Sequence, residues 1–134
     1  MKALSLWQPF AALVLSGAKT LETRGWKTTH RGPLLITSTK KPWPAPYPST
    51  VKICSEKGID VISLAQESPR GVAICVVDVV DSRSMVKEDD VNACIAFSFN
   101  RFVFELQNIR PVKQIPISGK QGIFNVEDDL IEYL

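Results

Sequence analysis

The sequence predicts an α+β fold, a small and largely antiparallel β-barrel decorated by two or three helices. About six short segments have the apolar periodicity of strands, whereas helical periodicity occurs only near the start and the middle of the chain. The elements do not alternate as they would in a doubly wound parallel sheet. With 134 residues, 45% of them hydrophobic, the chain is long enough to bury one core. We therefore expect a single domain that spans residues 1–134.

The first predicted elements are a strand, a helix and a second strand. Residues 2–6 have the pattern of a short strand, and Pro9 suits the first turn of a helix, where no backbone N–H is needed. Gly17 can take the left-handed conformation that ends a helix. A strand over residues 20–26 follows directly, so the charged side chains of this stretch lie at a bend between two elements.

The later elements complete the sheet and add helices. Residues 71–80 are apolar on both faces of a strand, which indicates a central position. A helix over residues 49–66 is weakened or split by Gly58, and acidic residues open a short helix within 83–95. Four prolines within residues 41–48 favour an extended loop. The other strands are predicted at residues 34–38, 102–108, 112–117 and 123–126.

Composition excludes several classes of protein. No apolar stretch is long enough to span a bilayer, and the N-terminal residues lack the layout of a secretory signal. We therefore expect a cytoplasmic location and no membrane partner. The three cysteines are widely spaced without a C-x-x-C pair, and the chain has one histidine. This composition predicts reduced thiols, no metal site and no cofactor.

The positive charge is concentrated in one segment. Residues 19–41 carry six lysines and arginines against Glu22 alone, a net charge of +5, whereas residues 42–134 carry a net charge of −4. Such a segment can attract a polyanion to one face of the molecule. The alternative is a solvated basic loop without a partner.

A charged motif lies in this segment, next to tryptophans. Lys19, Glu22 and Arg24 follow the predicted end of the first helix, and Trp7 and Trp26 flank them. An aromatic ring can stack on a base while a cation meets the phosphate. The alternative is an ion-pair set that stabilises the bend. The predicted nucleic-acid-binding residues are Trp7, Gln8, Lys19, Glu22, Arg24, Trp26 and Arg31, with Asn100, Arg101 and Lys120 as weaker candidates for the rim.

The pattern G-x-K-x-x-E-x-R at residues 17–24 resembles a known family. It is preceded by Ser-Leu-Trp-Gln-Pro-Phe-Ala at residues 5–11 and followed by a Trp-to-Ile stretch at residues 26–36. Together these segments resemble the ASCH domain, the activating signal cointegrator homology family, and the likeness extends over essentially the whole chain. The resemblance implies a PUA-like fold, with binding in the cleft between the first helix and the barrel.

The resemblance implies one of two functions. Cointegrator-type ASCH domains imply nucleic-acid binding, so the leading hypothesis is a module without catalysis that binds single-stranded RNA or DNA or a nucleotide unit. A compact bacterial branch instead hydrolyses an acetylated cytidine nucleoside with the motif lysine, a threonine and a distant glutamate. The competing hypothesis is therefore a small nucleoside amidohydrolase or a weak nuclease. A third hypothesis comes from the proline-rich loop and not from the resemblance. It is a protein-interaction module whose Pro-Trp-Pro loop docks a partner.

The motif departs from the hydrolytic branch. Its lysine corresponds to Lys19, but its threonine falls on Glu22, and Thr23 would point to the opposite face of the strand. A carboxylate beside Lys19 would also keep that amine protonated and unsuited to act as a base. We therefore expect no catalysis. The candidates for the distant carboxylate are Asp78, Asp81 and Glu88.

Overall fold

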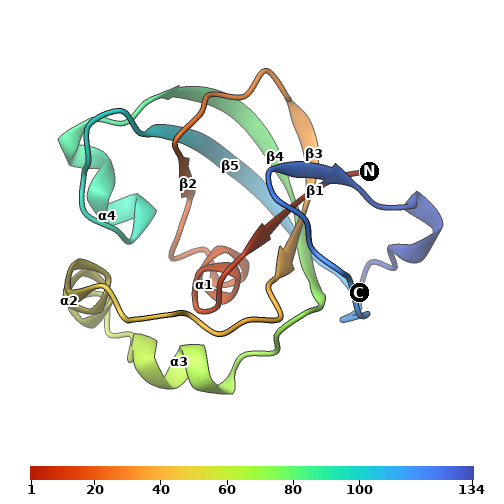
Figure 1. Cartoon of the computed structure of the whole chain (residues 1–134), viewed down its shortest axis with the longest axis horizontal. Helices are drawn as coiled ribbons and strands as arrows, with labels where there is room; N and C mark the ends of the chain where they lie inside the picture. The colour runs from red at the N-terminus through yellow and green to blue at the C-terminus, as the bar shows by residue number, and fades with distance from the viewer.

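The computed structural model describes all residues, 1–134, and shows a curved six-stranded sheet with four α-helices (Figure 1). The predicted α+β class is confirmed, with four α-helices in place of two or three. The strands, in sheet order, are β2 (Leu21–Arg24), β5 (Phe102–Pro111), β4 (Ala73–Ser84), β3 (Gly32–Ser38), β1 (Lys2–Leu6) and β6 (Ile123–Asn125). The helices are α1 (Phe10–Ser16), α2 (Pro48–Glu56), α3 (Val61–Glu67) and α4 (Asp90–Ala93), with short 3-10 turns at Lys87–Asp89 and Asp128–Leu130.

The sheet is largely antiparallel, as predicted. Only β1 and β3 pair in parallel, because the chain returns to the sheet through α1 and β2 before β3 begins. The sheet curves into a half-barrel, and α1 lies on its concave side (Figure 1). Helix α1 ends where the sequence predicted, since Gly17 has φ +84° and its N–H donates to the carbonyl of Val14.

The core lies on both faces of the central strand β4. Val77 and Val79 pack with Phe10 of α1 and Phe104 of β5 in the larger cluster, on the concave side. Val76 belongs to a second cluster on the other side, which the C-terminal segment completes. The prediction of a central strand that is apolar on both faces is confirmed, and this strand holds the two layers together.

Gly58 splits one expected helix, as the sequence allowed, and one expected strand does not form. The helix expected over residues 49–66 is divided into α2 and α3 at Gly58, whose φ is +76°, and Asp60 caps α3 by accepting from the Ser63 amide at 3.2 Å. The strand expected over residues 112–117 forms only isolated bridges. Pro111 and Pro116 bound that segment and have no N–H to donate to a ladder, so regular pairing stops there.

The functional candidates lie where the half-barrel stays open, between β1 and β2. These strands are not neighbours in the sheet order. A side chain bridges them, because Nη2 of Arg24 in β2 donates to the carbonyl of Ser5 in β1 at 3.0 Å. The fold thus brings the charged motif against the first strand. No helix is long and apolar enough to cross a membrane.

Candidate functional site

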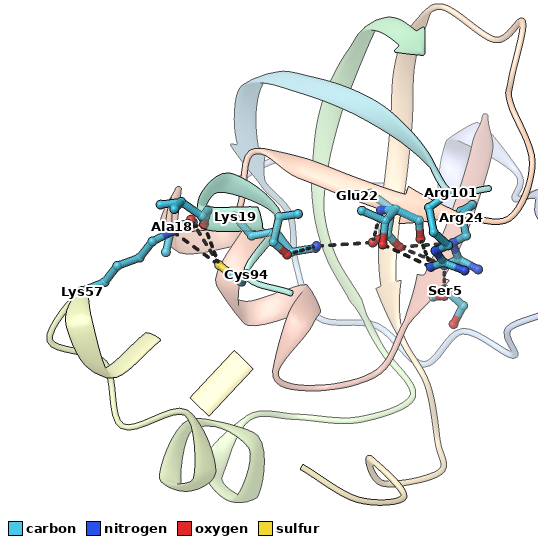
Figure 2. Close-up of polar contacts among 11 residues, drawn as sticks. Ser5, Ala18, Lys19, Glu22, Arg24, Lys57, Cys94 and Arg101 are labelled. Atoms are coloured by element: carbon cyan, nitrogen blue, oxygen red, sulfur yellow. Dashed lines mark hydrogen bonds and ion pairs between the residues drawn. The ribbon is translucent and has the colours of Figure 1, made fainter. Parts of the chain in front are cut away.

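A row of three charges, two buried and one half-buried, runs from the α1–β2 link into β2 (Figure 2). The Nζ of Lys19 lies 3.5 Å from Oε1 of Glu22. Oε2 of Glu22 accepts from Nε and Nη2 of Arg24 at 3.2 and 3.1 Å. Alternation along β2 puts Glu22 and Arg24 on one face, and the bend before the strand turns Lys19 toward them. Glu22 therefore lies between two cations.

Lys19 is among the largest fully buried side chains of the protein, with 2% of its surface exposed. Its Nζ donates to the carbonyl of Ala93 at 2.6 Å and lies 5.3 Å from the centre of the Phe10 ring. Burial lowers the pKa of Lys19 below its ordinary value of 10.5, and the charge of Glu22 opposes that shift. The neighbouring carboxylate is visible in the sequence, but removal of the amine from water is the larger effect on this pKa.

Glu22 is also buried, with 7% of its surface exposed. Burial alone would raise the pKa of its carboxyl, but Lys19 and then Arg24 lower it below the ordinary 4.5, so the group is a carboxylate at neutral pH. Its Oε1 accepts from the amide of Thr23 at 3.0 Å, and its Oε2 accepts from Arg24. Both carboxylate oxygens are therefore occupied by partners from the protein.

These charges form the wall of a cleft of about 300 Å³. Its aromatic side chains come from three segments, namely Trp7 after β1, Phe10 in α1 and Tyr47 before α2. A flat apolar ring and a charged wall are what a planar polar ligand requires. We call "the cleft" the surface formed by Leu6, Trp7, Phe10, Lys19, Glu22, Thr23, Arg24, Tyr47, Ile95 and Arg101.

The charged groups of the cleft that still have free hydrogen-bonding capacity are the donors of its two arginines. Arg24 uses Nε and Nη2, and Arg101 uses Nη2 for the carbonyl and hydroxyl of Thr23, so the Nη1 group of each arginine makes no hydrogen bond within the chain. Since the oxygens of Glu22 are occupied, the cleft favours an occupant that presents acceptors, such as a phosphate or a base carbonyl.

A second hollow, of about 630 Å³, adjoins the cleft on the other side of Arg24. It contains four cations and no carboxylate. Trp7 and Arg24 line both hollows. The turn at residues 118–121 approaches β1 closely, because a Cβ on Gly119 would lie 2.6 Å from Oγ of Ser5. We call "the basic groove" the surface formed by Ser5, Trp7, Arg24, Thr39, Lys40, Lys41, Ser118, Gly119, Lys120 and Gln121.

The structure brings four of the seven predicted site residues together in the cleft: Trp7, Lys19, Glu22 and Arg24. It places Gln8 elsewhere. Gln8 is 1% exposed, its Nε2 donates to the carbonyl of Pro69, and its Oε1 accepts from the amide of Ala12, each at 2.9 Å. Both ends of this side chain therefore hold α1 to the segment before β4.

Trp26 and Arg31 line neither hollow. The Trp26 ring packs edge-on against Phe104, with centroids 5.3 Å apart, and is 38% exposed. Arg31 donates to the carbonyls of Thr28 and His30 and lies 3.5 Å from the carboxylate of Asp81. Of the six cations in residues 19–41, those that line the hollows are Lys19, Arg24, Lys40 and Lys41.

Several lining residues were not predicted from the sequence. Phe10 belongs to the hydrophobic core as well as to the cleft, and Tyr47 lies within the proline-rich segment that was expected to be a loop. Ile95 belongs to a segment without a motif. Two weaker candidates do lie at the hollows, since Arg101 lines the cleft and Lys120 lines the basic groove. The signal for Arg101 was its position just before a predicted strand, and the signal for Lys120 was its place in a glycine turn.

Of the groups considered for hydrolysis, Lys19 and Thr23 line the cleft, whereas the candidates for the distant carboxylate do not. Thr23 was expected on the face of the strand opposite to Glu22, and its hydroxyl accepts from Nη2 of Arg101 at 3.1 Å. Glu22 is the only carboxylate in the cleft lining. The three candidates for the distant carboxylate lie elsewhere: Asp78 pairs with Arg110, Asp81 pairs with Arg31, and Glu88 is exposed.

The cysteines are free and buried. Burial, together with the neighbouring Cys94, raises the pKa of Cys54 to about 11, and burial raises that of Cys75 to about 12. Both thiols are therefore protonated at neutral pH and are poor nucleophiles. No group of three or more His, Cys, Asp and Glu side chains is placed to hold a metal ion.

Comparisons with known proteins agree on one family. The profile of the ASCH domain matches residues 4–115. Activating signal cointegrator 1 from Homo sapiens is 32% identical over 136 residues, and that from Mus musculus is 30% identical over 133 residues. Each alignment covers 95% of this chain but 22% of the relative, so the chain spans less than a quarter of their length.

Solved structures show the same fold. The ASCH protein from Zymomonas mobilis superposes with a TM-score of 0.61 at 14% identity, over 96% of this chain and 88% of that one. A tyrosine-to-phenylalanine mutant of the same protein gives a TM-score of 0.58 over 96% of this chain and 91% of that one. On the profile match and these folds, the chain belongs to the ASCH domain family.

Proposed function

We propose that this ASCH domain is a nucleic-acid-binding module that takes one base of single-stranded RNA or DNA in the cleft and the adjoining phosphates in the basic groove. The observation that carries the proposal is the shared wall of the two hollows, because Trp7 and Arg24 line both. An aromatic, donor-lined cleft beside a cation-lined groove matches the order of base and phosphate along a strand.

The charges support a polyanionic ligand. Lys40, Lys41 and Lys120 add to Arg24 in the groove, and Lys19 and Arg101 add to it in the cleft, against Glu22 alone. Glu22 is already neutralised by its two neighbours, so it does not repel phosphate strongly. A single strand suits the cleft better than a duplex, because an unstacked base can leave the strand and enter it.

The first test is binding of short single-stranded oligonucleotides at several salt concentrations. We expect weak binding whose affinity falls steeply with salt, by about 0.7 in log–log slope for each phosphate contact on a single strand. Anisotropy of a labelled RNA and a DNA of the same sequence, titrated at low and physiological salt, measures the slope. No binding at low salt, or binding that does not respond to salt, would contradict the proposal.

Hydrolysis of a modified nucleoside remains the second candidate, and one observation favours it: burial lowers the pKa of Lys19, which brings the amine nearer to the neutral form that a base requires. Against it, Glu22 lies 3.5 Å away, where the hydrolytic branch has a threonine, and is the only carboxylate lining the cleft. These two features weigh against the arrangement of nucleophile and second carboxylate that the resemblance implies for the hydrolytic branch.

We expect no release of acetate from acetylated cytidine. The assay incubates the protein with acetylated nucleosides and follows the deacetylated product by chromatography, with an acetylcytidine hydrolase as positive control. Product formed by the wild type and lost in a folded Lys19→Met variant would establish catalysis and replace the binding-module proposal. Product formed equally by both would indicate a contaminant.

A further inference from the structure

An exposed phenylalanine pair lies on the segment that joins α4 to β5. Phe99 is 82% exposed, which is exceptional for an aromatic side chain in this protein. Its ring contacts that of Phe97 edge-to-face, with centroids 5.1 Å apart. Phe97 in turn packs on a small core cluster with Leu21 and Val103. The outer ring is therefore supported from beneath while most of its surface stays in solvent.

This segment borders the cleft at both ends. Ile95 and Arg101, which lie on either side of the aromatic pair, both line the cleft. The segment is fixed on each side, because the amide of Ala96 donates to Oγ of Ser49 and Arg101 donates twice to Thr23. The exposed ring thus lies on a segment that is anchored on both sides and that borders a cleft with free arginine donors.

We infer that Phe99 is a second base-stacking site, which takes the nucleotide next to the one in the cleft. The inference rests on the proposed function and extends it from one nucleotide unit to at least two. Phe97 supports the ring, and Arg101, two residues after Phe99, lines the cleft and offers its Nη1 group to the phosphate that links the two nucleotides. The cations of the cleft and the basic groove favour an anionic strand as the ligand. The part of such a strand that stacks on an aromatic ring is the base.

Stacking on Phe99 does not depend on which base the nucleotide carries. Every base has a π-face, and the exposed ring offers no hydrogen-bonding group to discriminate among them. The cleft, with its directed donors, is the position that reads the base edge. The second site therefore contributes affinity without selectivity, and its contribution appears only for ligands longer than one nucleotide.

The test compares a mononucleotide with a hexanucleotide for wild type, Phe99→Ala, Phe99→Leu and Phe99→Trp. We expect Phe99→Ala to weaken hexanucleotide binding roughly tenfold, as loss of one stacked base does, and to leave mononucleotide binding unchanged. Phe99→Trp restores hexanucleotide affinity and Phe99→Leu does not. Val91→Ala, at another exposed apolar position on α4 outside the cleft, is the matched control and leaves both affinities unchanged.

The outcomes separate this inference from the proposed function. If the wild type binds the hexanucleotide and Phe99→Ala binds it equally well, the stacking site is wrong and the proposed function stands. Full affinity in Phe99→Leu also overturns it, because an apolar contact without a ring would then suffice. Oligonucleotides that lack one base locate the site along the strand. Removal of the base next to the one in the cleft should lower the affinity for the wild type and leave the affinity for Phe99→Ala unchanged. If the wild type binds no oligonucleotide, both proposals fail.

Discussion

Replacement of Lys40, Lys41 and Lys120 together by glutamine is expected to weaken oligonucleotide binding on the order of 100-fold at low salt, at about 1 kcal/mol for each charged contact. All three side chains line the basic groove, and the groove has no carboxylate. Each lost phosphate contact should also reduce the log–log salt slope by about 0.7, so the triple variant should lose roughly 2 from it. Anisotropy at four or more salt concentrations gives both quantities.

A matched triple variant controls for net charge. Lys52, Lys87 and Lys113 are exposed and lie outside both hollows, so their replacement by glutamine removes the same charge without touching the groove. We expect a small loss of affinity from the weaker long-range field, which salt screens. An equal loss in the two triple variants would show that net charge alone attracts the ligand and would contradict the basic groove as the site.

A variant of Arg31 tests whether the site extends beyond the two hollows to a residue that the sequence predicted. The sequence placed Arg31 in the binding set, whereas the structure pairs it with Asp81 outside both hollows. Arg31→Gln should therefore behave like the control lysines. A loss of affinity as large as that of a single groove lysine would mean that the strand continues past β3 and that the site is wider than the two hollows.

Replacement of Lys19 by methionine is expected to lower the free energy of unfolding by about 3 kcal/mol, because Glu22 would keep its charge in a buried site with one of its two cations gone. Urea unfolding at pH 7 measures the loss. The double variant Lys19→Met with Glu22→Gln should be less destabilised than the sum of the two single variants, since it leaves no unpaired buried charge. Additive losses would show that the two groups do not interact.

The same pair predicts a dependence of stability on pH. The folded-state pKa of Glu22 lies below its ordinary value of 4.5, so its stabilising contribution is complete above pH 4.5 and is lost as pH falls through the folded value. Asp60, Asp78 and Asp89 have lowered pKa values too. The comparison with Glu22→Gln isolates its share, because that variant should lose less stability between neutral and acid pH. Equal losses in both proteins would contradict the assignment.

Burial of Lys19 acts in the alkaline range with the same sign. Its folded-state pKa lies below 10.5, so the unfolded chain binds more protons between the two values, and the free energy of unfolding gains from this group as pH rises through that window. Lys19→Met removes this gain. Unfolding curves of wild type and variant from neutral to alkaline pH therefore test whether the buried amine titrates below its ordinary range.

Much of the half-barrel follows from local sequence. The period-two pattern and the apolar run of residues 71–80 located the strands, and Gly17 located the end of α1. The charged motif and its flanks indicated the family that the profile match shows. These features are encoded within short windows, because backbone propensity and face alternation depend on neighbours a few residues apart. The strand predicted at residues 112–117 was wrong for a local reason too, since the prolines beside and within it have no N–H for the ladder.

The composition of the site depended on the tertiary structure. Lys19, Glu22 and Arg24 are close in sequence and were found together, but Arg101 and Lys120 reach the hollows from segments about 80 and about 100 residues further along the chain. Gln8 follows Trp7 directly in the sequence, yet its side chain turns inward and holds α1 instead of lining the cleft. A sequence shows which side chains can carry charge or stack. Curvature of the sheet, which brings β1 and β2 to one opening, decides which of them face the same space, because that arrangement arises from long-range packing.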